Sequence, residues 1–332
     1  MRRHFPTVEE IVSGIRAGSR VVLGQAITLV ESARADHQAL AQDVIARLLT
    51  EAPAEPATLR IGITGAPGVG KSSLIEALGI YLLEQGRCVA VLAIDPSSSI
   101  SGGSILGDKT RMERLSVAAG AFVRPSPAGT SLGGVARKTR ETILLVEAAG
   151  YDTVLIETVG VGQSEVAVRR MTDVFLLLLL PGAGDELQGI KRGIVELADL
   201  LAVNKADGER LALAQQAQRH YRNAVHLLPK SRSGWSPQVL LCSAQEGKGV
   251  AELWTAILHY RQQTQQNGFF AQNRWQQAHY WLEEALQAGL QALFQGNKDA
   301  QQLLKTLEPE VLAGRLSPFA AAEKVLRAFG NK

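Results

Sequence analysis

The sequence predicts an α/β fold: a doubly wound, mostly parallel β-sheet flanked by helices, with a helical segment before it and a helical arm after it. Two patterns carry this prediction. From Leu59 onward, short apolar runs alternate with segments of helical periodicity, which is typical of strand–helix units in a parallel sheet. Several of these runs are apolar throughout, as expected for strands that helices cover on both faces.

The composition limits the classes of protein that fit. The 332 residues suffice for about two domains. A net charge of +3 without a dense Lys/Arg block gives no indication of a nucleic-acid surface. Cys88 and Cys242 form no disulfide or metal pattern, and we expect both in buried strands of a reduced protein. The longest apolar run, Val174 to Leu180, is too short to cross a bilayer, and the N-terminus lacks an apolar stretch of signal-peptide length. We therefore expect a cytoplasmic protein without a membrane partner.

Residues 1–52 are expected to form an N-terminal helical segment. Thr7 and Glu10 have the spacing of a capping box, and Ile11 and Ile15 continue one helical face. Two further apolar stripes at helical spacing follow, at Leu23, Ile27 and Val30 and at Leu40, Val44 and Leu48. The pattern predicts three short helices before the sheet.

Residues 53–261 carry the alternation and are expected to form the main domain. The expected strands are Leu59–Thr64, Cys88–Ile94, Thr153–Glu157, Val174–Leu180, Leu200–Asn204 and Val239–Ser243. Helices are expected at Ser72–Gln85 and at about Val135–Ala149. Ligands of such sheets bind at the carboxyl ends of the strands, so functional residues are sought there.

Residues 262–332 have a purely helical pattern. Ser317 and Pro318 look like an N-cap and a first-turn proline. Large apolar side chains recur at helical spacing at Trp275, Leu282, Leu286, Leu290 and Leu293. We expect a packing surface that either folds back on the domain or serves as a dimerisation arm.

A phosphate-binding loop follows the first expected strand. Its residues match the pattern G-x-x-x-x-G-K-[ST], between a strand and a helix as the pattern requires. Glycines let backbone N–H groups surround an anion at a helix N-terminus. Lys71 can reach the β- and γ-phosphates, and the Ser72 hydroxyl can ligate Mg²⁺. The expected nucleotide-binding residues here are Gly65, Ala66, Pro67, Gly68, Val69, Gly70, Lys71, Ser72 and Ser73.

The segment Asn204-Lys205-Ala206-Asp207 follows a later strand and indicates the base. A carboxylate such as that of Asp207 can accept hydrogen bonds from both N1–H and the exocyclic amine of guanine, whereas adenine offers no such donor pair. Ser243, Ala244 and Gln245 end the next strand and fit a loop that supports the base. We therefore predict a guanine-nucleotide site.

Three acidic residues are candidates for the metal and the attacking water. Glu157 ends a strand in the segment Glu157-Thr158-Val159-Gly160, where a carboxylate can order water on Mg²⁺. Asp95 ends another strand and is followed by a small, polar segment. Asp108 lies just beyond that segment, where a solvated loop acid is the alternative interpretation. A second glycine-rich, charged segment, Gly182–Lys191, suggests a movable loop over the site.

Five ordered motifs resemble the MeaB/ArgK group of GTPases. They are GAPGVGKSS, AIDPSSS, ETVGVGQSE, PGAGDELQGIK and NKAD, and the likeness covers nearly the whole chain. The resemblance implies a homodimeric GTPase of the class that includes signal-recognition GTPases and nickel-insertion chaperones. Such a protein would escort adenosylcobalamin-dependent methylmalonyl-CoA mutase, gate its cofactor loading and protect it from inactivation.

The same resemblance implies roles for individual residues. Lys71 and Ser72 would hold phosphates and Mg²⁺, with Asp95, Asp108 and Glu157 around the metal and the attacking water. Asp207 would read guanine. Asp185, Gln188 and Lys191 would belong to a third switch that signals nucleotide state to the mutase. Gln163 is a further candidate for positioning the attacking water, against the alternative of a surface contact. No ligand pattern for cobalamin is present, so cobalamin is not expected to bind this chain directly.

Two other functions remain open from the sequence. A kinase linked to basic amino-acid transport is implied by the older family name, although a guanine-reading Asp207 disfavours ATP. A metallochaperone would need metal ligands, and the six histidines are scattered without a Cys-x-x-Cys or His-rich tract. No in-chain arginine finger is evident, so we expect slow GTP turnover that a partner stimulates.

Overall fold

The structure is a computed structural model that describes residues 6–51, 57–94, 112–125, 132–158, 164–182, 192–229 and 231–330. The chain divides into two compact units, Met1–Arg274 and Trp275–Lys332. The first unit contains a sheet with helices on both faces. The second is helical throughout its described part, which ends at residue 330.

A parallel sheet forms the centre of the first unit, in the strand order β3-β2-β4-β1-β5-β6-β7 for the described residues. The strands are β1 (Leu59–Gly65), β2 (Val89–Ile94), β3 (Ala121–Arg124), β4 (Thr153–Thr158), β5 (Val174–Leu179), β6 (Leu200–Val203) and β7 (Gln238–Leu241). The predicted fold class is thereby confirmed. β3 is absent from the sequence-based prediction, because its apolar run is too short to distinguish from a loop.

β1 lies at the middle of this sheet and pairs with β4 on one side and β5 on the other. All of its residues are buried. The order of the strands reverses around β1, since β2 and β3 lie on one side and β5, β6 and β7 on the other. Parallel sheets bind ligands at the carboxyl edge of such a switch point. The loop that follows β1 therefore lies where the fold favours a ligand.

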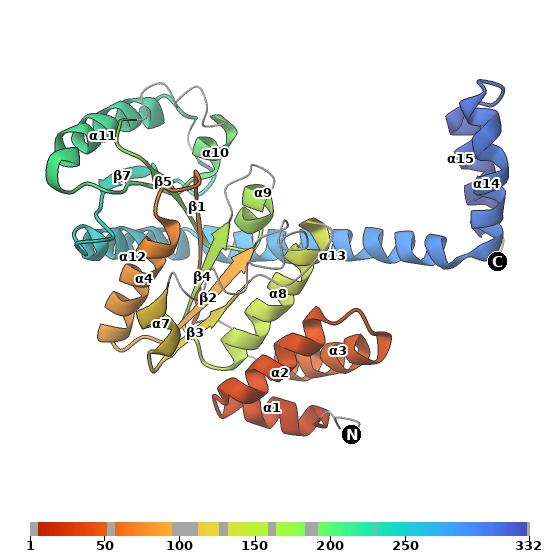
Figure 1. Cartoon of the computed structure of the whole chain (residues 1–332), viewed down its shortest axis with the longest axis horizontal. Coiled ribbons are helices and arrows are strands. Elements are labelled where there is room, and N and C mark those ends of the chain that lie inside the picture. The colour runs from red at the N-terminus through yellow and green to blue at the C-terminus, as the bar shows by residue number, and fades with distance from the viewer. Residues whose placement is uncertain are drawn as a thin grey trace. The chain divides into compact units, whose positions relative to one another are not determined.

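Helices cover both faces of the sheet (Figure 1). On one face α4 (Lys71–Glu84), α7 (Glu113–Val117) and α12 (Val250–Gln266) close a large apolar core. The other face carries α8 (Leu132–Ala148), α9 (Ser164–Arg169), α10 (Arg192–Leu197), a short 3₁₀ turn (Gly208–Arg210) and α11 (Leu211–His226). The two layers explain why the strands read as continuous apolar runs.

The three predicted N-terminal helices are present as α1 (Val8–Arg16), α2 (Arg20–Glu31) and α3 (Ala35–Thr50), and they pack on α8. The Thr7 side chain caps α1 and the Glu10 side chain reaches back to the Thr7 backbone, which confirms the capping box. An ion pair between Arg124 of β3 and Glu31 of α2 also ties these helices to the sheet.

The second unit contains the end of α13 (Phe269–Gly296), together with α14 (Lys298–Leu312) and α15 (Pro318–Gly330). The last helix begins at Pro318, as predicted. Phe294 and Phe329 meet edge to face with ring centroids 5.7 Å apart. No helix within the described ranges is long and apolar enough to cross a membrane.

The expectation for the cysteines is only partly right. Cys242 is buried but follows the last residue of β7, and Cys88 precedes β2 and is half-exposed. Both lie one residue outside the assigned strand, although backbone hydrogen bonds continue there: the Cys88 carbonyl accepts from the Thr153 N–H at 3.1 Å, and the Cys242 N–H donates to the Val203 carbonyl at 2.9 Å. Assignments of strand ends commonly differ by a residue or two.

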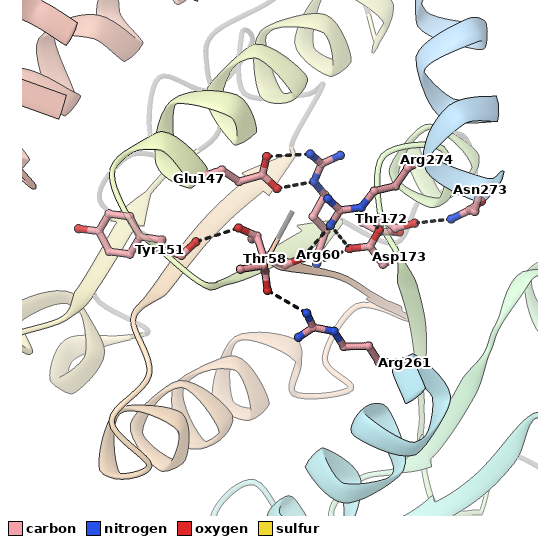
Figure 2. Close-up of polar contacts among 10 residues, drawn as sticks. Thr58, Arg60, Glu147, Tyr151, Thr172, Asp173, Arg261, Asn273 and Arg274 are labelled. Atoms are coloured by element: carbon pink, nitrogen blue, oxygen red, sulfur yellow. Dashed lines mark hydrogen bonds and ion pairs between the residues drawn. The ribbon is translucent and has the colours of Figure 1, made fainter. Parts of the chain in front are cut away.

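The amino-terminal edge of the sheet holds a network of buried ion pairs (Figure 2). Arg60 of β1 forms a bidentate pair with Glu147 of α8, with N···O distances of 2.6 and 2.7 Å. The Asp173 carboxylate accepts from the Arg60 backbone N–H at 2.8 Å and from the Arg274 guanidinium at 2.7 Å through both oxygens. Arg274 also donates to the carbonyl oxygen of Thr58. The start of α13 is thus bound to the residues that precede β1 and β5.

A second buried pair joins neighbouring elements at the same edge. Asp199, just before β6, accepts from the Arg169 guanidinium at 3.2 Å and from the Phe175 backbone N–H at 2.8 Å. Burial raises the pKa of Asp199, while the adjacent Arg169 opposes that rise. The indole N–H of Trp235 donates to the Asp199 carbonyl. Charges at this edge are therefore held by fixed structural partners.

Candidate functional site

The loop between β1 and α4 requires glycine at two positions. Gly70, the N-cap of α4, has φ +95°, in the left-handed region, and a Cβ there would lie 2.6 Å from Nδ2 of Asn204. At Gly65 a Cβ would lie 2.6 Å from the carbonyl oxygen of Leu178. These contacts give the physical reason for two of the residue types that the motif contains.

Lys71 begins α4 and folds its side chain back over the loop. Its Nζ donates to the carbonyl oxygens of Gly65 at 2.9 Å and Ala66 at 3.2 Å. Val69 is buried in the core beneath the loop, whereas Ala66, Pro67, Gly68 and Ser73 are exposed. An ammonium group above an exposed loop at a helix N-terminus is suited to phosphate, whose oxygens can replace the carbonyls as acceptors.

Ser72 and Glu157 meet beside this loop. The Ser72 hydroxyl donates to Oε1 of Glu157 at 3.1 Å, although the two residues are far apart in sequence. Glu157 is the penultimate residue of β4, at the carboxyl edge of the sheet. A hydroxyl and a carboxylate are hard oxygen ligands of the kind that Mg²⁺ prefers. The donor set therefore fits a magnesium ion bound together with nucleotide phosphates.

Asn204 connects the phosphate loop to the expected base loop. Its Nδ2 donates to the carbonyl oxygen of Val69 at 2.9 Å, and its Oδ1 accepts from the backbone N–H of Ala244 at 3.1 Å. The thiol of Cys242 lies 3.6 Å from the same oxygen. Burial raises the pKa of the Cys242 thiol to about 12, so the thiol stays protonated and can donate weakly.

The remaining residues of the base region also cluster. Lys205 has φ +60° and its Nζ donates to the carbonyl oxygen of Gly68 at 2.8 Å. The Ser243 hydroxyl donates to Oδ2 of Asp207 and accepts from the backbone N–H of Glu246 at 3.2 Å. These bonds orient the Asp207 carboxylate. Gln245 is exposed in the same loop.

The described part of the site thus brings together Lys71, Ser72 and Glu157 at one end and Asn204, Lys205, Asp207, Ser243 and Ala244 at the other. Several residues predicted from the sequence lie outside the described ranges: Asp95, Asp108, Gln163, Asp185, Gln188 and Lys191. Among described residues, no group of three or more His, Cys, Asp or Glu side chains forms a metal cluster.

Sequence reasoning missed two residues that contact each other next to the site. The Thr158 hydroxyl donates to the Thr64 hydroxyl at 2.9 Å. Each threonine directly neighbours a predicted site residue, Gly65 or Glu157, and that adjacency was the available signal. It was weak because threonine is common in strands.

Comparison with known proteins gives similarity over nearly the full length. A profile of the family described as methylmalonyl-CoA mutase-associated GTPase MeaB matches residues 23–299. A Caulobacter vibrioides protein described as a GTPase is 52% identical, over 97% of this chain and 98% of its own. A mouse protein named methylmalonic aciduria type A homolog, mitochondrial, is 44% identical, over 98% of this chain and 80% of its own.

A solved structure gives the same result for the fold. The crystal structure titled LAO/AO transport system kinase has a TM-score of 0.76 and 36% identity, and the match covers 96% of each chain. The similarity extends over the sheet, the phosphate-binding loop and the helical segments at both ends of the chain.

Proposed function

The chain belongs to the MeaB family of methylmalonyl-CoA mutase-associated GTPases, and on that premise we propose that it is a GTP-driven chaperone of adenosylcobalamin-dependent methylmalonyl-CoA mutase. As a member of a P-loop GTPase family it hydrolyses GTP to GDP and phosphate. The proposed role is to gate loading of the cofactor into the mutase and to protect the mutase, with cobalamin held by the mutase and not by this chain.

The observation that carries the nucleotide assignment is the pair of hydrogen bonds by which Asn204 connects the phosphate loop to the base loop. One side chain there holds both the carbonyl of Val69 in the phosphate loop and the N–H of Ala244 in the base loop. A loop for phosphates and a loop for a base are useful together only to a ligand that contains both. The Asp207 carboxylate, oriented by Ser243, supplies acceptors for the two donors of guanine.

In this proposal each residue of the site has a separate role. Lys71 neutralises charge on the β- and γ-phosphates as negative charge shifts during hydrolysis. Ser72 and Glu157 would hold Mg²⁺, directly or through water, and the ion when bound neutralises phosphate charge. The backbone N–H groups of Gly68 to Lys71 surround the phosphates. Asp95 and Asp108 are proposed as further groups around the metal and the attacking water.

The relatives support the mutase as partner through their names. The family is described as mutase-associated, and the mouse relative is named for methylmalonic aciduria. Asp185, Gln188 and Lys191 are proposed to transmit nucleotide state to the mutase as part of a third switch. We place this activity in the cytoplasm of the cell that makes the mutase.

A homodimer is the proposed assembly. We propose three parts of the chain: a helical segment at 1–52, a GTPase domain at 53–261 and a dimerisation arm at 262–332. Large apolar side chains on α13 are exposed by 58–67%: Trp275, Leu282, Leu286, Leu290 and Leu293. Apolar side chains repeated along one helix are typical of helix pairing. Sedimentation of a Leu286→Glu variant beside the unchanged chain tests this: a dimer that persists in the variant would count against the arm.

The decisive experiment measures GTP hydrolysis by the purified chain with and without methylmalonyl-CoA mutase from the same cell. ATP as substrate and a Lys71→Ala variant serve as controls. We expect slow GTP turnover, acceleration by the mutase, and little turnover of ATP or by the variant. If GTP is hydrolysed but the mutase changes nothing, the chaperone proposal fails while the GTPase assignment stands.

A second candidate function is a kinase in basic amino-acid transport. The observation that favours it is the solved structure titled LAO/AO transport system kinase, at 36% identity. Incubation with GTP or ATP labelled at the γ-phosphate, together with extract from the same cell, tests this candidate. Label on a protein would favour the kinase, and label only in inorganic phosphate would favour the GTPase alone.

A further inference from the structure

Two buried threonines meet at the point where the sheet opens to form the site. Thr64 of β1 and Thr158 of β4 are each only 1% exposed, and their hydroxyls lie 2.9 Å apart with Thr158 as donor. A buried hydroxyl costs free energy unless it is hydrogen-bonded, and replacing both partners of such a bond by apolar groups of the same shape can be nearly neutral. The fold alone would be served as well by two valines, so the bond itself needs an explanation.

The position of this bond in the ladder suggests what it does. β1 and β4 pair in parallel from Leu59 opposite Thr153 to Ile63 opposite Glu157, and the paired residues end there. Beyond Ile63, β1 stays paired with β5 through Thr64 and Gly65, and the phosphate loop follows Gly65. The Thr64–Thr158 bond continues the connection between the two strands one residue further, with side chains in place of backbone groups.

On the β1 end of the Thr64–Thr158 bond, the next residue, Gly65, contacts Lys71. Thr64 is followed by Gly65, whose carbonyl oxygen accepts from Nζ of Lys71 at 2.9 Å. Gly65 is paired with Leu178 of β5 in the sheet. The hydroxyl of Thr64 is therefore attached to the last paired residues of β1, directly before the loop.

The β4 side leads to the proposed metal ligands. Thr158 follows Glu157, whose Oε1 accepts from the Ser72 hydroxyl at 3.1 Å. Ser72 follows Lys71 in the chain. Covalent bonds and three hydrogen bonds thus form a closed ring through Thr64, Gly65, Lys71, Ser72, Glu157 and Thr158. A phosphate would replace only the Lys71 contact, so the path from Thr64 through Thr158 and Glu157 to Ser72 would remain in the nucleotide-bound site.

Glu157 and Thr158 face opposite sides of β4, because side chains alternate along a strand. Leu155, which shares the side of Glu157, belongs to the core beneath α4, where Ser72 lies. The threonine pair therefore touches neither the phosphates nor the metal position. It can influence the site only through the backbone position of Glu157.

We propose that the Thr64–Thr158 hydrogen bond positions Glu157 against Ser72 and so sets the affinity of the nucleotide-bound site for Mg²⁺. Thr64 and Thr158 are positioning residues, and this inference rests on the proposed magnesium site. It does not depend on the mutase, because the bond and the ring lie within this chain.

The test measures how Mg²⁺ slows the release of a fluorescent GDP analogue from the purified chain. In Thr158→Val and Thr64→Val we expect the Mg²⁺ concentration for half-maximal slowing to rise about two- to tenfold, the equivalent of one net hydrogen bond. GDP affinity in excess EDTA should stay within about twofold of the unchanged chain, because the guanine and phosphate contacts are intact. Thr158→Ser keeps the hydroxyl and should restore the original Mg²⁺ dependence.

Two further variants separate positioning from general stability. Thr139→Val removes a buried threonine hydroxyl of α8 that bonds within its own helix and is not part of the ring, and it should leave the Mg²⁺ dependence unchanged. The double variant Thr64→Val/Thr158→Val should be no worse than either single variant, because both remove the same bond. If Thr158→Val does not fold, Thr64→Val carries the same comparison from the other end of the bond.

The inference is overturned if both valine variants keep the original Mg²⁺ dependence, or if Thr139→Val shifts it equally. If Mg²⁺ at any concentration leaves GDP release from the unchanged chain unaffected, the proposed magnesium site itself is contradicted. Failure of the mutase to stimulate hydrolysis would affect neither result.

Discussion

The two edges of the central sheet treat charge in opposite ways. At the amino-terminal edge, the guanidinium groups of Arg60, Arg169 and Arg274 each contact a carboxylate within 3.2 Å. At the carboxyl edge, Lys71 and Lys205 donate to backbone carbonyl oxygens of the phosphate loop. Carbonyls are weaker partners for an ammonium than carboxylates are, so a phosphate can displace them.

The difference separates charged groups that stabilise the fold through ion pairs from charged groups that could bind a ligand. Carbonyl oxygens do not neutralise the ammonium group of Lys71 as a carboxylate would. The ion pairs of Asp173 and Asp199 lie instead at the edge where no ligand is expected, and they fix the strands whose other ends form the site. Four experiments, three with variants and one with chemical labelling, test this contrast.

The largest effect is expected at Lys71. Lys71→Ala should lower the rate of GTP hydrolysis by about 10²- to 10³-fold, because charge developing on the phosphates loses its buried cation. The unfolding temperature should change little, since the described contacts that are lost, to the carbonyl oxygens of Gly65 and Ala66, are weaker than a buried ion pair. Steady-state phosphate release and a thermal melt measure both quantities, and a variant with near-normal turnover would contradict the assignment.

The next effect concerns the choice of base. In Asp207→Asn an amide replaces the carboxylate that Ser243 orients. Guanine then faces an N–H₂ donor, while xanthine offers a carbonyl acceptor at that position, so selectivity for GTP over XTP should fall by about 10²-fold or more. Competition of the two nucleotides for a fluorescent GDP analogue measures the ratio. An unchanged ratio would mean that another residue reads the base.

At the opposite edge, Asp173→Asn should affect stability and leave nucleotide binding intact. The variant leaves the buried Arg274 guanidinium without its carboxylate, which costs about 3 kcal/mol of unfolding free energy. Urea unfolding measures the loss of unfolding free energy, and titration with a GDP analogue measures how tightly the folded protein binds the nucleotide. Asp36→Asn is a matched control, because Asp36 pairs with Arg34 on the exposed surface and its loss should not move the midpoint. Equal effects of the two substitutions would contradict the proposed difference between buried and exposed pairs.

The smallest effect is chemical labelling at Cys242. Burial raises the pKa of this thiol to about 12, so only about 10⁻⁴ of it is thiolate at pH 8. Iodoacetamide at pH 8 should therefore modify the half-exposed Cys88 first in the folded chain. Mass spectrometry of the labelled protein measures this, and both thiols should react after unfolding. Faster labelling of Cys242 in the folded chain would show that the base loop opens readily.

The parts of the molecule that the sequence predicts are those encoded by neighbouring residues. The phosphate loop was predictable because its glycines, Lys71 and Ser72 are neighbours in the sequence, between the end of β1 and the start of α4. The strands were predictable because long apolar runs leave few alternatives. β3 was not, since four residues with two half-exposed members give no distinctive pattern.

Contacts between distant residues could not be predicted in this way. Asp173 and Arg274 are 101 residues apart, and Thr64 and Thr158 are 94 apart. Their pairing depends on the order of the strands, which an apolar pattern does not specify when nearly every residue of β1, β4 and β5 is buried. The sequence predicts the candidate side chains of the site but not the residues that contact them from distant parts of the chain.

In the proposed site, Asn204 would separate recognition from signalling. Its amide links the phosphate loop to the base loop. GTP and GDP carry the same base and the same β-phosphate, so both would meet the same half of this site. The two nucleotides differ only in the γ-phosphate, which the region of Ser72 and Glu157 would contact. One part of the proposed site would thus identify guanine, while the other would report how many phosphates remain.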